Sequence, residues 1–232
     1  MKTSVIIPAL NEEKCIAKVI KRIKESTLVD EIIVVDNNST DKTNEIANSL
    51  GVKTIICSKK GKGYAMEAGL KIATGDIIVF ADADIQNYQK GFIDDMITPI
   101  LNKKADFVKS SFEREGGRVT ELVAKPLLEL LFPKLSKFDQ PLSGIIAGKK
   151  KLFSKIKFEK DYGVDVGILI DVYKEKARIK QVNIGKIKND SKNWKDLIGM
   201  AKQVSTAILK RADIGKKLNI KTVKRMENLI KN

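Results

Sequence analysis

Four short apolar runs alternate with helical patterns near the start of the chain, and this alternation limits the fold more than any other feature. The runs are Ser4–Pro8, Glu31–Asp36, Thr54–Cys57 and Asp76–Ala81. Each run is almost continuously apolar, as in a strand that is covered on both faces of a sheet. Strands of this kind separated by helices form βαβ units. The sequence therefore predicts an α/β fold with a mostly parallel central sheet and helices on both faces.

The second half of the chain is less regular. We expect strands at Asp106–Ser111 and Ile179–Ile184, and a loop that leads into a third strand at Asp139–Gly148. We expect helices at Thr120–Phe132, Val164–Glu175 and Trp194–Arg211. Trp194 is expected to anchor the start of the last helix or the core, and Asn11 to cap the first helix. Since no linker or internal repeat is evident, we predict a single domain over residues 1–212 and a basic tail over residues 213–232.

The chain contains no histidine, and this removes several classes of enzyme. A Ser-His-Asp triad, a histidine general base and a zinc site built on imidazole are all excluded. Two cysteines, Cys15 and Cys57, are too few for a disulfide framework and suit the reducing cytoplasm. We expect no transmembrane segment, because no run of about 18 apolar residues occurs. The first residues have too short an apolar core for a signal peptide.

The formal net charge is +15, and two interpretations of it stay open. A lysine-rich composition alone would produce it, and a basic surface would also attract phosphorylated substrates or anionic lipid. With 6% aromatic residues and no basic patch interleaved with aromatics, we expect no nucleic-acid partner. The tail from Lys210 to Asn232 carries eight basic and two acidic residues. It is interpreted as a solvated helix end, or as a peripheral contact with a membrane or a partner subunit.

Polar clusters follow the four predicted strands of the first half. They are residues 8–13, 36–41, 58–63 and 82–84. Ligands of open parallel sheets bind at the carboxyl ends of the strands. Four polar clusters at one edge therefore predict a binding site there.

The pair Asp82 and Asp84 directly follows the fourth strand. Two carboxylates at this spacing can face one divalent cation and a diphosphate. Such a cation would neutralise charge on a leaving nucleoside diphosphate. The alternative is a solvated turn in which one acid caps the next segment.

Three segments of the first half, SVIIPALNEE, IIVVDNNSTDKT and ATGDIIVFADAD, resemble the nucleotide-sugar-binding half of GT-A-fold glycosyltransferases. The resemblance implies that residues 1–110 bind a nucleoside-diphosphate sugar. It implies that Pro8, Leu10 and Glu12 border the nucleoside, that Asp36 contacts the base or ribose, and that Lys62 reaches the diphosphate. It also implies that Asp82 and Asp84 serve the sugar, the phosphate and Mg²⁺ or Mn²⁺.

The chemistry of these residue types agrees with the implied roles. A carboxylate at a strand end, such as Asp36, accepts hydrogen bonds from ribose hydroxyls or a uracil N–H. Lys62 lies in a glycine-containing loop that opens a helix, where phosphate binding is reasonable. The alternatives are that Glu12 and Asp36 cap a helix and a turn, and that Lys62 is a solvated lysine.

Four segments of the second half resemble glucosyl-3-phosphoglycerate synthases, a retaining group with the same fold. They are VKSSFEREGGRVTELVAKPLLELLFP, DQPLSGIIAG, YGVDVGILIDVY and QVNIGKIKNDSKNWKDLIGMAKQV. The resemblance implies that residues 111–212 form the acceptor side, with Gly117, Arg118 and Thr120 holding a phosphoglycerate. Backbone amides, a guanidinium and a hydroxyl suit a phosphate or carboxylate. The resemblance also allows a homodimer.

The chain departs from the pattern of this group at three places. Ile145 replaces an acid after the glycine of QPL-x-G, and Asp165 replaces a glutamate. Asn189, followed by Asp190, stands where the group has a metal-binding histidine, and either residue offers an oxygen ligand. Asp165 is interpreted either as an acid that contacts sugar hydroxyls or the acceptor, or as a helix-start acid favoured by the dipole.

Taken together, the residues and the resemblance predict a metal-dependent hexosyltransferase. It would move glucose from UDP- or GDP-glucose to a small phosphorylated acceptor similar to 3-phosphoglycerate, with retention implied by the resemblance. Asp84 and Asp165 are the expected catalytic residues, and Asp84, Asn189 and Asp190 the expected metal ligands. Two alternatives stay open: transfer to a polyprenyl phosphate at a membrane, and a non-catalytic protein that binds a nucleotide sugar.

Overall fold

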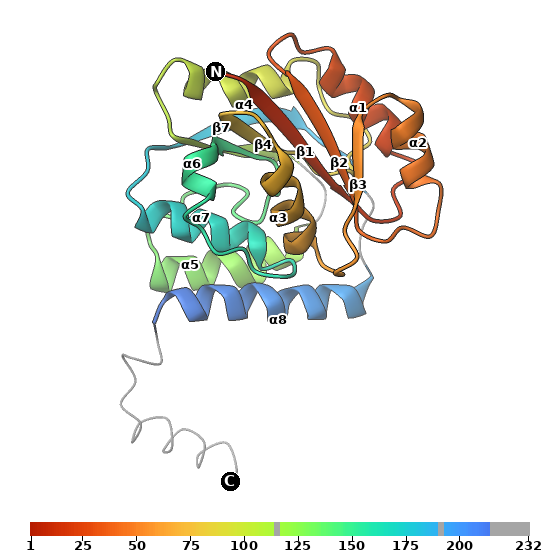
Figure 1. The fold of residues 1–232 in the computed structure, drawn as a ribbon. Helices are drawn as coiled ribbons and strands as arrows, with labels where there is room; N and C mark the ends of the chain where they lie inside the picture. The colour runs from red at the N-terminus through yellow and green to blue at the C-terminus, as the bar shows by residue number, and fades with distance from the viewer. Residues whose placement is uncertain (114–116, 190–192, 214–232) are drawn as a thin grey trace.

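The computed structural model describes residues 1–113, 117–189 and 193–213 (Figure 1). The strands are β1 Thr3–Ala9, β2 Glu31–Asp36, β3 Lys53–Ile56, β4 Ile77–Phe80, β5 Phe107–Glu113, β6 Ile146–Lys149 and β7 Ile179–Lys186. The helices are α1 Ile16–Lys24, α2 Thr43–Ser49, α3 Lys62–Ile72, α4 Phe92–Leu101, α5 Lys125–Leu131, α6 Lys150–Phe153, α7 Val164–Lys174 and α8 Trp194–Arg211. A turn of π-helix, η1 Thr120–Ala124, leads directly into α5.

The strands form one seven-stranded sheet in the order β3-β2-β1-β4-β6-β5-β7. Strand β6 runs antiparallel to both of its neighbours, β4 and β5. The other neighbouring pairs are parallel. The expected mostly parallel sheet is therefore confirmed, and the carboxyl ends of β1, β2 and β4 meet at one edge.

Two apolar cores cover the two faces of the sheet, because successive side chains of a strand point to opposite faces. In β1, Ile6 packs on the face covered by α3 and α7, whereas Val5 and Ile7 pack on the face covered by α1 and α4. These residues are fully buried. Each such side chain contributes roughly 1.5–3 kcal/mol on burial. Helix α8 extends this arrangement below α5 and α7 (Figure 1).

Some local expectations are wrong. Asn11 does not cap the first helix, which begins at Ile16: it has a positive φ of 57°, and its Oδ1 accepts a hydrogen bond from the Thr40 N–H. Trp194 does start α8, but its surface is 63% exposed, so it is not a core residue. The sequence pattern also assigned no element to α4, which contains Pro99.

Within the described residues, no helix is both long and apolar enough to cross a membrane. Neither Cys15 nor Cys57 forms a disulfide bond. Asp190 and the tail beyond Asp213 lie outside the described residues. The proposals for a ligand at Asp190 and for contacts of the tail therefore stay predictions.

Candidate active site

A cleft of about 530 Å³ lies at the carboxyl edge of the sheet. It is lined by residues from both halves of the chain. Eight of the residues predicted from the sequence lie on its wall: Pro8, Leu10, Glu12, Lys62, Asp82, Asp84, Asp165 and Asn189. The fold therefore gathers into one cleft the residues expected to serve the donor and the metal.

The backbone around Lys62 is shaped by two glycines. Gly61 has a φ of +140°, and its N–H donates to the Asn37 Oδ1 at 2.7 Å. A Cβ at Gly61 would lie 2.3 Å from the carbonyl oxygen of Lys160, and the Gly63 N–H donates to that same oxygen at 3.1 Å. Only glycine allows so close an approach. The packing of this loop on the chain near Lys160 places Lys62 at the first position of α3, with its side chain in the cleft.

Lys62 is shared by two carboxylates. Its Nζ lies 2.8 Å from the Asp82 Oδ1 and 2.9 Å from the Asp165 Oδ2. Burial alone would lower the pKa of Lys62, but the charges of Asp165 and Asp82 outweigh it and hold the pKa above its usual 10.5. A Cβ at Gly144 would lie 2.3 Å from both the Lys62 Nζ and the Asp82 Oδ1. The ammonium group is therefore fixed, charged and closely covered by backbone.

Asp165 lies in the first turn of α7 and is 2% exposed. Burial, the largest effect, raises the pKa of its carboxyl, whereas Lys62 lowers it and Asp82 raises it further. Its second oxygen, Oδ1, has no hydrogen-bond partner, and neither does the Oε1 of Gln203 on α8. Both side chains line the cleft. Buried acceptors of this kind need donors, so a ligand with hydroxyl groups fits this wall.

Asp84 and Asn189 are the cleft residues best suited to a divalent cation. Their side chains meet at 3.3 Å, between the Asn189 Nδ2 and the Asp84 Oδ2. Carboxylate and amide oxygens are hard ligands that Mg²⁺ and Mn²⁺ accept. The described residues contain no cluster of three or more acidic or cysteine side chains that could enclose a metal. The pair therefore fits a cation that takes its other ligands from a diphosphate and water, as Mg²⁺ commonly does.

A fully buried lysine supports the floor of the cleft. Lys109 of β5 is 0% exposed, and its Nζ donates to the carbonyl oxygen of Ser143 at 2.6 Å. Burial lowers the pKa of Lys109 to about 8, although the charge of Asp165 acts in the opposite direction. The hydroxyl of Ser143 bonds to that of Ser110 at 2.8 Å and accepts from the Ile145 N–H at 3.1 Å. These contacts fix the loop that carries Gly144, whereas the side chain of Ile145 is buried in the core on the α1 face.

Asp36 was expected to meet the base or ribose, and the structure places it beside the cleft rather than on its wall. It is 3% exposed and accepts a hydrogen bond from the Ser39 N–H at 3.1 Å. Its neighbour Asn37 lines the cleft instead. The side chain of Asn37 is held by the loop, since its amide donates to the carbonyls of Cys57 and Lys59.

The expected acceptor residues lie together at the start of η1 and are not among the residues that line the cleft. Gly117 has a φ of +89°, and its carbonyl accepts from the Glu121 N–H. Thr120 is 1% exposed. The guanidinium of Arg118 lies 5.8 Å from the centre of the Trp194 ring, a cation–π arrangement. Trp194 therefore joins α8 to the predicted acceptor segment.

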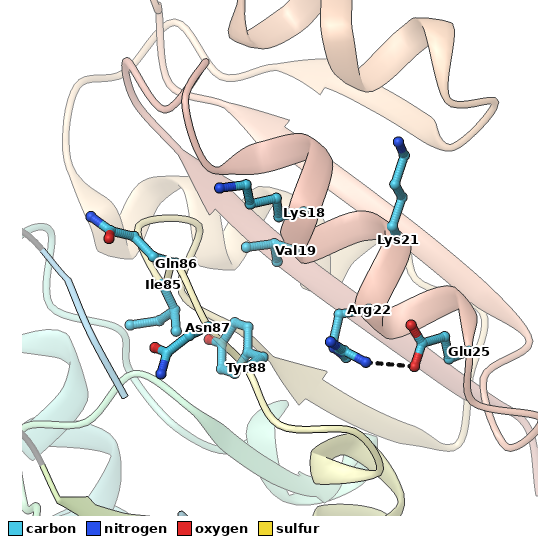
Figure 2. A pocket seen from close by; sticks show the side chains of 9 residues that line it. All are labelled: Lys18, Val19, Lys21, Arg22, Glu25, Ile85, Gln86, Asn87 and Tyr88. Atoms are coloured by element: carbon cyan, nitrogen blue, oxygen red, sulfur yellow. Dashed lines mark hydrogen bonds and ion pairs between the residues drawn. The ribbon is translucent and has the colours of Figure 1, made fainter. Parts of the chain in front are cut away.

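A second, smaller hollow of about 250 Å³ lies between α1 and the segment Ile85–Tyr88 (Figure 2). Its charged residues come from the last two turns of α1 and from the C-cap Glu25, and Arg22 is paired with Glu25 at 2.8 Å. The Tyr88 hydroxyl donates to the backbone carbonyl of Asp82 at 3.1 Å. Tyr88 therefore links the lining of this hollow to the segment that carries the acidic pair.

Sequence reasoning missed several residues of the cleft. Met200 and Gln203 line it, and so does Ser143, which Lys109 holds; Tyr162, which the sequence indicated as a residue that shapes the pocket, also lines it. One signal could have found Gln203: a polar side chain next to Val204 on the side of α8 that packs on the core.

The sheet order, the acidic pair behind β4 and the lysine at the start of α3 together form the framework of a GT-A-fold glycosyltransferase, and comparisons with known proteins agree. The model of glycosyl transferase family 2 matches residues 4–161, and the chain belongs to this family. Within the family it is similar to glucosyl-3-phosphoglycerate synthases. The synthase of Mycolicibacterium smegmatis is 36% identical over 235 aligned residues, which cover 91% of this chain and 78% of the relative.

Solved structures give the same result. The Mycobacterium tuberculosis glucosyl-3-phosphoglycerate synthase in complex with Mn²⁺, UDP-glucose and phosphoglyceric acid has a TM-score of 0.86 and 38% identity, with 91% of this chain and 79% of that chain covered. The same enzyme in complex with Mg²⁺ and UDP has a TM-score of 0.86 at 38% identity, with the same coverage. The expected fold and enzyme class are therefore confirmed.

Proposed function

We propose that this glycosyltransferase moves glucose from UDP-glucose to 3-phosphoglycerate or a similar phosphorylated acceptor, with Mg²⁺ or Mn²⁺ as cofactor. The observation that carries the proposal is Lys62, held in the cleft between Asp82 and Asp165, next to Asp84. The similar Mycobacterium tuberculosis enzyme binds UDP-glucose, phosphoglyceric acid and Mn²⁺ together, which supports the same set of ligands here.

The donor side of the reaction follows from charge. As the bond from the sugar to the diphosphate breaks, negative charge grows on the leaving UDP, and groups already fixed around it stabilise that charge best. Lys62 offers such a group, since its neighbours keep it protonated. Asp84 and Asn189 would hold Mg²⁺ or Mn²⁺, whose chemistry is to neutralise diphosphate oxygens.

The sugar would lie against the wall formed by α7 and α8. The free acceptors there, the Oδ1 of Asp165 and the Oε1 of Gln203, would take hydrogen bonds from sugar hydroxyls. This assigns Asp165 to sugar binding near the reacting carbon. Holding the sugar in one orientation turns the reaction into an effectively unimolecular step.

The acceptor would be held by Arg118, Thr120 and the amide of Gly117. A guanidinium binds phosphate or carboxylate with strong, directional hydrogen bonds, and Trp194 steadies the guanidinium of Arg118. We also propose that the anomeric configuration is retained by displacement on one face. Both Asp82 and Asp165 are tied to Lys62, which makes them poor nucleophiles.

The test is the release of UDP by purified protein supplied with UDP-glucose, Mg²⁺ and 3-phosphoglycerate, with the product anomer read by NMR. Asp84→Ala should abolish metal-dependent turnover, because it removes the carboxylate ligand. No UDP release over a matrix of nucleotide sugars and phosphorylated acceptors would count against the proposal.

Two other outcomes are distinguishable in the same matrix. The replacement of an acid by Ile145, and of a histidine by Asn189, would fit a protein that binds the donor without turnover. Calorimetry with UDP-glucose would show binding while the activity assay stays silent. Transfer to a polyprenyl phosphate would instead require activity with that lipid and co-sedimentation with liposomes.

A further inference from the structure

The two proposed metal ligands come from segments far apart in the chain. Asp84 follows β4, and Asn189 follows β7, 105 positions later. A cation that takes both as ligands needs the two segments at a fixed separation. What holds them together is therefore part of the site.

The side chain of Asn87 joins these segments. Its Nδ2 donates to the carbonyl oxygen of Lys186 at 3.1 Å, and its Oδ1 accepts from the Lys188 N–H at 2.5 Å. Next to it, the Gln86 N–H donates to the carbonyl oxygen of Lys188 at 2.9 Å. An asparagine side chain carries the same donor and acceptor as a peptide group. Asn87 thus bonds to residues 186 and 188 as the backbone of a neighbouring strand would.

The neighbours of Asn87 favour the same arrangement. Gln89 packs over Gly185, where a Cβ would lie 1.9 Å from the Gln89 Nε2. Tyr88 stacks on Phe92 at 4.0 Å and faces the hollow on the α1 side (Figure 2). The segment is therefore packed on both sides, and Asn87 supplies its polar link to the end of β7.

We propose that Asn87 is a positioning residue of the metal–diphosphate site: its amide fastens the acidic segment to the end of β7 and so sets the separation of Asp84 and Asn189. The proposal rests on the proposed function, since it takes these two residues as metal ligands. Asn87 itself does not line the cleft, so it acts through the segments that it joins.

Asn87→Ala tests the proposal. With UDP present, we expect this variant to bind Mn²⁺ about 10-fold more weakly than the wild type. This is the smallest loss of metal affinity that is typical when a residue that positions the metal ligands is removed. Free Mn²⁺ is measured by electron paramagnetic resonance. The Mn²⁺ concentration for half-maximal turnover should rise by a similar factor, while kcat at saturating Mn²⁺ stays near the wild-type value.

Asn183→Ala is the matched control. The Asn183 Oδ1 accepts from the Gly185 N–H at 2.7 Å, so this variant loosens the end of β7 without touching residues 86–88. It should leave Mn²⁺ affinity unchanged. Asn87→Gln keeps the amide but moves it by one methylene, and we expect the same weakening as for alanine. It carries the test if the alanine variant does not fold.

The outcomes separate the proposal from the function on which it rests. Equal Mn²⁺ affinity in the wild type and both Asn87 variants would overturn the positioning role and leave the function standing. The same loss in Asn183→Ala would also overturn it, because general loosening of β7 would then be the cause. A wild-type protein that binds neither UDP nor Mn²⁺ would overturn the proposed function and the positioning role together.

Discussion

Replacing Gly144 by alanine should damage the active site while leaving the fold in place. The added Cβ would lie 2.3 Å from the Lys62 Nζ and from the Asp82 Oδ1, whereas ordinary contact begins at 3.4 Å. Both atoms end flexible side chains, so the backbone can stay and the ion pair must move by about 1 Å. A misplacement of that size in a catalytic constellation costs on the order of 100-fold in rate.

The magnitude follows from this displacement. A 100-fold loss of kcat/KM corresponds to about 2.7 kcal/mol of transition-state stabilisation. Overpacking costs typically 1–3 kcal/mol of folding stability, and we expect the lower part of that range because only side-chain ends are displaced. Gly144→Ala should therefore be folded and nearly inactive.

The assay is initial-rate UDP release over a range of UDP-glucose concentrations, with urea unfolding measured on the same preparations. Gly199→Ala is the control, since no atom lies within 4 Å of a Cβ at that position of α8. It should keep full activity and gain a little stability, as alanine is the better helix former. Wild-type kcat/KM in Gly144→Ala would refute the argument that the Lys62–Asp82 pair must stay where it is.

Three further substitutions give separate tests. Arg118→Ala should raise the KM for 3-phosphoglycerate about 10-fold or more with little change in kcat, as expected for loss of a charged binding contact; initial rates decide, and an unchanged KM would contradict the assignment. Asp106→Asn concerns a carboxyl whose pKa is held well below its usual 3.8 by Arg178 and then by Lys149. Since the folded state keeps this carboxylate ionised, the carboxylate stabilises the fold at neutral pH, and this stabilisation is lost as the pH falls below about 4. The difference in the free energy of unfolding between wild type and variant, measured in urea, should therefore become smaller from pH 7 to about pH 2. Lys109→Met concerns a lysine whose pKa is lowered to about 8 from its usual 10.5. Between these two values the unfolded chain binds the proton more tightly, so the wild type should gain stability relative to the variant as the pH rises through this window; a constant difference would argue against a buried charge at this position.

The fold of the first half could be predicted because its strands are buried on both faces. Their continuous apolar runs gave β1, β2, β3 and β4 to within two residues at each end. Local signals were less reliable where a distant contact decides the conformation. Asn11 illustrates this, because its side chain bonds to Thr40, 29 positions away, instead of capping the helix that follows. The helix α4 was missed although its buried residues recur at helical spacing and Pro99 lies only in its last turn.

The chemistry of the site could be predicted in kind but not in arrangement. The acidic pair and Lys62 stood out from the sequence, since they follow strand ends. That Lys62 also binds Asp165 could not be foreseen, because 103 positions separate the two residues and only the packing of α7 brings them together. Similarly, Asp36 has the residue type expected of a donor contact, yet the turn at Ser39 uses its carboxylate.

The pairing of Lys62 with two carboxylates has a consequence for how the substrate enters. Removing the Lys62 ammonium from water is unfavourable, and the carboxylates of Asp82 and Asp165 offset that free energy when the chain folds. If Lys62 binds the diphosphate of the donor, as proposed, the ammonium exchanges one set of anionic partners for another and does not have to be dehydrated at that point. Donor binding would then be a competition between the diphosphate and the two carboxylates for Lys62, and a ligand with too little negative charge would not displace Asp82 and Asp165.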